Sequence, residues 1–233
     1  MNPFEIVRVH GRRVWDSRGR PTVEAEIGLA GGAVGRAIAP AGASTGSGEA
    51  VDRRDGGPAF GGMDVRGAVA AVGGQLARAI SGLDARGQAV VDGAMIAADG
   101  STNRARLGAN AIVALSMATA WAAANQAREP LWRYLGGEAA RLMPLPEIQI
   151  FGGGAHAGRR VDVQDFLIVC PGAETFAEAL DWTAEVYRAA GALMAERGQL
   201  MGVADEGGFW PAFATNEEAL DALSGIDINT EAF

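Results

Sequence analysis

The first forty residues alternate apolar and polar side chains in a way that is typical of β-strands. In the segment PTVEAEIGLA, apolar residues occupy every second position and two glutamates lie between them, which predicts a strand with one dry face. The apolar positions are Val23, Ala25, Ile27 and Leu29. Gly31 and Gly32 then supply a hairpin turn into the strand-like AVGRAIA, and Pro40 ends that strand. Residues 4–39 are therefore expected to form a three-stranded β-meander.

The pattern becomes helical and alanine-rich from about residue 63 to residue 127. So many small side chains favour close helix packing, and Pro130 marks the end of the last helix. Residues 143–170 return to strand-like segments, LPEIQIF and VQDFLIVC, which are separated by a glycine loop. This order predicts a small α+β domain followed by the opening of an α/β domain.

A long amphipathic helix is predicted over residues 174–197, with Gly198 as its C-terminal stop. Its apolar stripe comprises Phe176, Leu180, Ala184, Tyr187, Gly191 and Met194. A short apolar segment, LMGVA, and the acidic-glycine turn DEGGF follow the helix. The second domain is thus expected to begin with strand, strand, helix and strand.

Composition and charge narrow the function classes. The net charge of −8 disfavours binding to nucleic acid or to an anionic membrane surface. No run approaches the roughly 18 consecutive apolar residues of a membrane-spanning helix, and the start of the chain lacks the apolar core of a signal peptide. The cytoplasm is therefore the expected location. A single cysteine excludes an intrachain disulfide and a cysteine-based zinc cage.

Three segments place polar or ionisable groups on glycine-rich backbone near the ends of apolar segments, where functional groups usually lie in α/β folds. They are WDSRGRPTVEAE with the loop GASTG, then FGGGAHAGRRVDVQDF, and finally GVADEGGF. The run GGGAHA formally fits a dinucleotide-binding pattern, but the residues after it open a strand and not the helix that such a site requires. A P-loop motif is absent.

Taken together, the motifs are similar to those of the enolase family, in the same order and at similar spacings. They are VWDSRGRPTVEAE, APAGASTGSGEAVDRRDG, DGSTNRARLGANAI, PLWRYLGG, GGGAHAGRRVDVQDF and ADEGGFWPAFATNEEAL. The resemblance covers about residues 5–223. It implies an α+β N-terminal domain over residues 1–140, with a three-stranded meander plus helices. Residues 141–233 would then form the incomplete start of an α/β (TIM-like) barrel, whose strands are expected to be parallel.

The resemblance also implies an activity and a set of site residues. The family interconverts 2-phosphoglycerate and phosphoenolpyruvate with Mg²⁺ as cofactor. It implies that Ser44 closes over the substrate and ligates a magnesium ion, and that His156 lies near the substrate phosphate and leaving group. Gln164 and Asp165 would contact substrate and water, and Glu206 would be the general acid that protonates the departing hydroxide.

Each of these residues has an alternative interpretation from its own surroundings. His156 fits a solvent-exposed or structurally bonded histidine, and Glu206 fits a solvated carboxylate in a turn. Gln164 and Asp165 fit the polar end of a strand. For Arg18 and Glu24, an arginine–carboxylate brace beneath the loop at residues 41–50 is as good an interpretation as a substrate contact.

The chain departs from the family pattern at the site. Gln149 and Gly152 occupy positions where the family has asparagines, so the glycine loop is expected to lose amides that anchor it. Asp165 replaces the usual glutamate and is shorter by about 1.5 Å of reach, a misplacement that can cost about 10²-fold in rate. On this view, Asp165→Glu would raise turnover.

The resemblance places the family's lysine base and its magnesium carboxylates beyond residue 223. The isolated chain is therefore expected to be inactive. Alternatives are a non-catalytic remnant or dimerising binding module, and a piece of a longer reading frame. The expected partners are a phosphorylated small-molecule substrate and, because the family pairs largely through its N-terminal domain, a second copy or another enolase chain.

Overall fold

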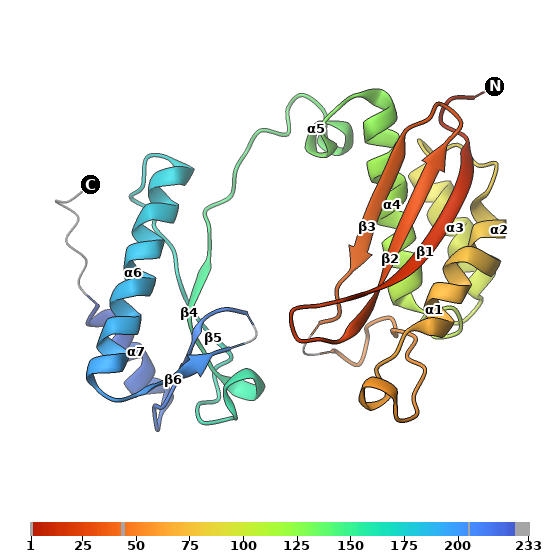
Figure 1. The fold of residues 1–233 in the computed structure, drawn as a ribbon. Coiled ribbons are helices and arrows are strands. Elements are labelled where there is room, and N and C mark those ends of the chain that lie inside the picture. The colour runs from red at the N-terminus through yellow and green to blue at the C-terminus, as the bar shows by residue number, and fades with distance from the viewer. Residues whose placement is uncertain (1, 43–44, 205, 227–233) are drawn as a thin grey trace. The chain divides into compact units, whose positions relative to one another are not determined.

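A computed structural model describes residues 2–42, 45–204 and 206–226, apart from the side chains of His156 and Pro211. The chain divides into two compact units, Met1–Ala140 and Arg141–Phe233 (Figure 1). Each unit has a hydrophobic core of its own. No helix of the described residues is long and apolar enough to cross a membrane.

The first unit begins with the predicted meander. Strands β1 (Ile6–Trp15), β2 (Pro21–Leu29) and β3 (Val34–Ala39) form an antiparallel sheet in that order. The four alternating apolar residues of β2 are all buried, which confirms the dry face. The opposite face of β2 is also crowded, since Glu24 is 5% exposed beneath arginines of the flanking strands.

Helices follow the sheet, as the alanine-rich pattern predicts. They are η1 (Ala59–Gly62), α1 (Arg66–Ala71), η2 (Val72–Leu76), α2 (Ala77–Ile80), α3 (Gln88–Asp99), α4 (Ala109–Ala127) and α5 (Leu131–Gly136). Helix α4 packs against β2 and β3 (Figure 1). The approach is close at Gly35, where an added Cβ would lie 2.1 Å from the Ala118 carbonyl oxygen. Small side chains on α4 allow this contact.

The second unit contains a four-stranded sheet in the order β5-β4-β7-β6. Its elements are β4 (Ile148–Gly152), η3 (Gly154–Ala157), β5 (Asp165–Ile168), α6 (Phe176–Glu196), β6 (Leu200–Val203), β7 (Phe209–Pro211) and α7 (Asn216–Ser224). Its core includes Ile150, Phe151, Met194 and Phe213. The rings of Phe151 and Phe213 pack edge to face, with 5.4 Å between their centroids. Figure 1 shows α6 beside this sheet.

Two details of the second unit differ from the sequence-based expectation. Among the described strands only β4 and β7 pair in parallel, whereas β4 pairs with β5 and β6 with β7 in antiparallel fashion. The chain between β4 and β5 holds only the short turn η3, so it has no crossover helix to return it to a parallel start.

The apolar stripe predicted for α6 was also wrong in part. Phe176, Leu180 and Ala184 are exposed, and the buried residues are Ala179, Thr183, Ala190 and Met194. The buried face at the start of the helix is therefore rotated by one residue from the predicted one. Gly191 faces the ring of Phe209, where an added Cβ would lie 2.7 Å from the ring.

Candidate functional site

Gln164 and Asp165 lie where β5 begins, opposite Gly152 at the end of β4. The Gln164 side chain is exposed and donates a 3.1 Å hydrogen bond from Nε2 to Asp165 Oδ2. Its carbonyl oxygen accepts a 2.6 Å hydrogen bond from the Gly153 N–H. The two predicted site residues therefore form one polar group at the end of the central strand.

Glu206 lies in the turn between β6 and β7, and its side chain is exposed. The turn is closed by backbone hydrogen bonds from Ala204 N–H to the Gly208 carbonyl (2.7 Å) and from Gly207 N–H to the Ala204 carbonyl (3.0 Å). The hydroxyl of Tyr187 on α6 donates a 2.9 Å hydrogen bond to the Gly207 carbonyl. A positive φ of 102° at Gly207 fits glycine, so the residue at this position suits the turn.

Gln149 on β4 connects these two groups. Its Nε2 donates to Asp165 Oδ1, and its Oε1 accepts a 2.9 Å hydrogen bond from the Gly208 N–H. Sequence reasoning treated Gln149 only as a lost loop asparagine and missed this link. The one available signal was a polar side chain between the apolar neighbours Ile148 and Ile150.

The glycine loop after β4 is held mainly by its own backbone. The Gly154 N–H donates a 2.9 Å hydrogen bond to the Val161 carbonyl, and Asn216 Oδ1 on α7 accepts from Asp162 N–H (3.0 Å) and Val163 N–H (3.1 Å). The loop lacks asparagine amides at positions 149 and 152, and Asn216 supplies an amide to it from a different element. His156 belongs to η3 in this loop, and its side chain lies outside the described part of the structure.

A surface hollow of about 300 Å³ opens beside this loop. It is lined by Gly154, Ala155, Arg159, Val161, Asp162 and Gln164. The volume is at the lower end of the range for small-molecule sites. Gln164 and Arg159 thus line the same hollow.

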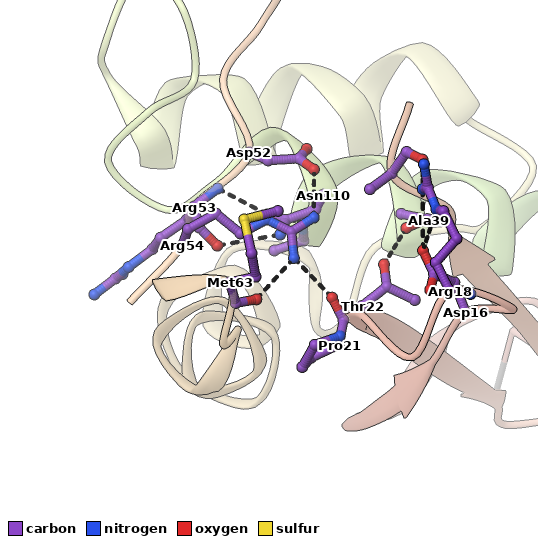
Figure 2. Close-up of polar contacts among 12 residues, drawn as sticks. Asp16, Arg18, Pro21, Thr22, Ala39, Asp52, Arg53, Arg54, Met63 and Asn110 are labelled. Atoms are coloured by element: carbon purple, nitrogen blue, oxygen red, sulfur yellow. Dashed lines mark hydrogen bonds and ion pairs between the residues drawn. The ribbon is translucent and has the colours of Figure 1, made fainter. Parts of the chain in front are cut away.

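Around the predicted substrate loop of the first unit, arginines act as braces. Arg18 forms an ion pair with Asp16 at 3.0 Å and donates a 2.8 Å hydrogen bond from Nη2 to the Ala41 carbonyl, so the structure favours the brace interpretation (Figure 2). The Arg20 N–H, first among several donors, holds the pKa of Asp16 below its ordinary value. Glu24 forms ion pairs with Arg12 and Arg36. Ser44 lies outside the described residues.

The far end of the same loop is also fixed. Arg54 Nη1 donates to the carbonyls of Pro21 (2.7 Å) and Met63 (3.0 Å), and its Nη2 pairs with Asp52 at 3.2 Å (Figure 2). Asn110 at the start of α4 accepts a 3.2 Å hydrogen bond from the Arg53 N–H. Both ends of residues 41–50 are therefore anchored to the folded unit.

Two family models match successive parts of the chain. One, described as "Enolase, N-terminal domain", matches residues 6–135, and another, described as "Enolase, C-terminal TIM barrel domain", matches residues 140–230. The chain belongs to the enolase family. The three-stranded sheet with its helices is the enolase N-terminal domain, and the second unit is the start of the enolase barrel domain.

Curated relatives named enolase are similar over nearly the whole chain. The enolase of Rubrobacter xylanophilus is 52% identical over 94% of this chain and 51% of the relative, and that of Acidothermus cellulolyticus is 53% identical over the same shares. "Enolase 1" of Desulfitobacterium hafniense is 48% identical over 96% of this chain and 51% of the relative. The chain thus spans about half the length of the curated enolases that it matches.

Membership of the enolase family implies Mg²⁺ dependence in general. Residues 2–42, 45–204 and 206–226 contain no group of three or more His, Cys, Asp or Glu side chains that could hold a metal ion. Mg²⁺ is usually held by one or two carboxylates together with water and substrate phosphates, and no metal site is shown among the described residues.

Proposed function

We propose that this chain provides the acid side of an enolase active site, which converts 2-phosphoglycerate to phosphoenolpyruvate and water. The observation that carries the proposal is the Gln149 bridge, which joins Asp165 to the turn that bears Glu206. In a barrel, catalytic groups come from the ends of different strands. The bridge joins the start of β5, which carries Asp165, to the turn after β6, which carries Glu206.

The proposed chemistry divides the reaction into two proton transfers. A base removes the proton from C2 of 2-phosphoglycerate, and the hydroxyl on C3 leaves as water once an acid has protonated it. We assign the acid to Glu206, with Asp165 and Gln164 contacting substrate and leaving water. His156 near the substrate phosphate and Ser44 in the loop of the first unit complete the assignment, and Ser44 is also the proposed magnesium ligand.

The family resemblance implies a lysine base, and His156 is already assigned near the substrate phosphate, so we propose that the base comes from elsewhere. The 20 strongly basic residues of the chain are all arginines, which remain protonated at neutral pH, so no lysine in residues 1–233 can serve as the base. Enolase-superfamily sites use a lysine or histidine base with one or two Mg²⁺ ions. We therefore propose that residues 1–233 do not turn over substrate alone and that they act with a second segment that supplies the base and the metal carboxylates.

The other expectations made from the sequence belong to the same proposal. The substrate is a phosphorylated small molecule of glycolysis, the location is the cytoplasm, and the chain pairs with a second copy or with another enolase chain. The absence of lysine favours one further candidate for residues 1–233 alone, a non-catalytic module that binds an enolase subunit. Sedimentation of the chain with and without the Rubrobacter xylanophilus enolase would detect such a complex.

The test uses a chimera in which residues 1–223 of this chain are followed by the remaining segment of the Rubrobacter xylanophilus enolase. With Mg²⁺ and 2-phosphoglycerate, the chimera should form phosphoenolpyruvate, measured by its ultraviolet absorbance, and the chain alone should not. A folded chimera without activity would contradict the proposed function. Magnesium-dependent turnover by the purified chain alone would contradict the assignment of the base to another segment.

A further inference from the structure

Gln149 is a polar residue inside the sheet of the second unit. It lies on β4, which is flanked by β5 on one side and β7 on the other, and it is partly buried. Its neighbours along the strand, Ile148 and Ile150, are apolar, and Ile150 is fully buried. A carboxamide in such a place is costly unless both of its polar ends are hydrogen-bonded.

Both ends of the Gln149 carboxamide are bonded, and the partners fix its orientation. The Gly208 backbone N–H can only donate, so it must meet Oε1, which lies 2.9 Å away. The other end of the amide, Nε2, can only donate, and Asp165 Oδ1 accepts its hydrogen bond. The amide therefore has one orientation, with the Glu206 turn on its oxygen and the Asp165 carboxylate on its nitrogen.

Two glycines allow the turn to approach the bridge. An added Cβ at Gly208 would lie 2.4 Å from Gln149 Oε1, and one at Gly152 would lie 2.5 Å from the Ala204 Cβ. Ala204 and Gly208 are the two ends of the turn, joined by the hydrogen bond from Ala204 N–H to the Gly208 carbonyl. Ala204 and Gly208, the two ends of the turn, therefore both lie close against β4.

From these contacts we propose that Gln149 is a positioning residue, which sets the distance between the Asp165 carboxylate and the turn that carries Glu206. The role in catalysis rests on the proposed function, whereas the bridge itself does not. A displacement of about 1 Å at a reacting group can cost about 10²-fold in rate. Loss of the bridge should therefore lower kcat of the chimera by up to about 10²-fold and change KM little.

The bridge also changes the expectation for Asp165. From the sequence alone, Asp165→Glu would raise turnover by restoring reach. Since Gln149 Nε2 already meets Asp165 Oδ1, an added methylene would push the carboxylate into the amide. We expect Asp165→Glu alone and Gln149→Asn alone each to lower kcat. The double exchange should recover part of the loss, because the combined length toward residue 165 is then unchanged whereas the contact with Gly208 stays weakened.

The first experiment needs no activity. Amide hydrogen exchange of Gly208 is measured by NMR in the full chain, in Gln149→Met and in Gln149→Glu. Exchange at Gly208 should be at least about 10-fold faster in Gln149→Met, because the acceptor is lost, and unchanged in Gln149→Glu, which keeps an oxygen toward Gly208. Gln199→Met is the matched control, since the Gln199 amide bonds Glu218 outside the bridge, and it should leave Gly208 unchanged.

The second experiment measures kcat and KM in the chimera. Gln149→Glu should lower kcat, because it retains the Gly208 contact but turns an oxygen toward Asp165. Recovery in the double exchange would support the length argument. Unchanged Gly208 exchange in a folded Gln149→Met, or full kcat in Gln149→Glu, would overturn the inference. An inactive chimera whose Gly208 exchange responds as expected would instead refute the proposed function and leave the bridge intact.

Discussion

Replacing Gly35 by alanine tests the packing of the first unit at its closest point. The new Cβ would lie 2.1 Å from the Ala118 carbonyl oxygen, 2.1 Å from the Ala122 nitrogen and 2.7 Å from the Ala122 Cα. All three are backbone atoms of α4, so no side chain can rotate away. Ordinary contact would require β3 and α4 to separate by more than about 1 Å.

The cost of this separation follows from overpacking. Inserting a methyl group into a packed interior typically costs about 1–3 kcal/mol. We expect about 3 kcal/mol here, because β3 and β2 both lose contact with the helix that covers them. For a unit of this size, that corresponds to a fall in Tm of roughly 10 °C. Thermal unfolding by circular dichroism, with urea midpoints as a second measure, would report it.

Gly93→Ala is the matched control. Gly93 lies within α3, has no heavy atom within 4 Å of the position that an added Cβ would take, and has no positive φ. The same substitution should there stabilise the unit by about 0.5–1 kcal/mol, because alanine is the better helix former. A Gly35→Ala protein that melts within a degree of the wild type would refute the described contact between β3 and α4.

Three further predictions concern stability. Asp64 is paired with Arg13, whose hydrogen bond is the first cause of a lowered Asp64 pKa. The contribution of the Asp64 carboxylate to stability is therefore present above its ordinary pKa of about 3.9 and is lost as pH falls through the folded pKa. Asp64→Asn should lower the urea midpoint at pH 7 and flatten the fall of that midpoint between pH 4 and 2. Thr215 caps α7, because its hydroxyl oxygen accepts a hydrogen bond from the Glu218 N–H. Thr215→Ala should destabilise the second unit by about 1 kcal/mol in urea unfolding. The control Thr102→Ala, at an exposed position of the first unit, should lack this effect. Amide exchange should be faster from about residue 143 onward than in the first unit, because the second core is smaller; uniformly slow exchange in a monodisperse sample would contradict this.

Local patterns predicted most of the fold. The alternation in β2 specifies which side is buried, and the alanine-rich run predicts the close packing of α4, because each pattern is read within one element. Strand β7 was not predicted, since its three residues include a proline and its pairing depends on β4 and β6. The buried face of α6 was misplaced by one residue for a similar reason, because it is set by contacts with the sheet.

The candidate site shows the same limit. The motifs located Gln164, Asp165 and Glu206 along the chain, and the structure joins the first two directly. The role of Gln149 depends on partners 16 and 59 residues away, which no local pattern relates to each other. A polar residue inside a strand signals that a partner is needed, but only the sheet order shows which partner it has.

Glu206 is proposed above to supply the acid of an enolase site. The most direct test is the turnover of the chimera carrying Glu206→Gln, beside a Glu217→Gln control in the first turn of α7. We expect Glu206→Gln to lower kcat by at least about 10²-fold while the circular dichroism spectrum and substrate binding stay unchanged, and Glu217→Gln to keep full activity. Equal activity of the two variants would contradict the assignment of the acid to Glu206.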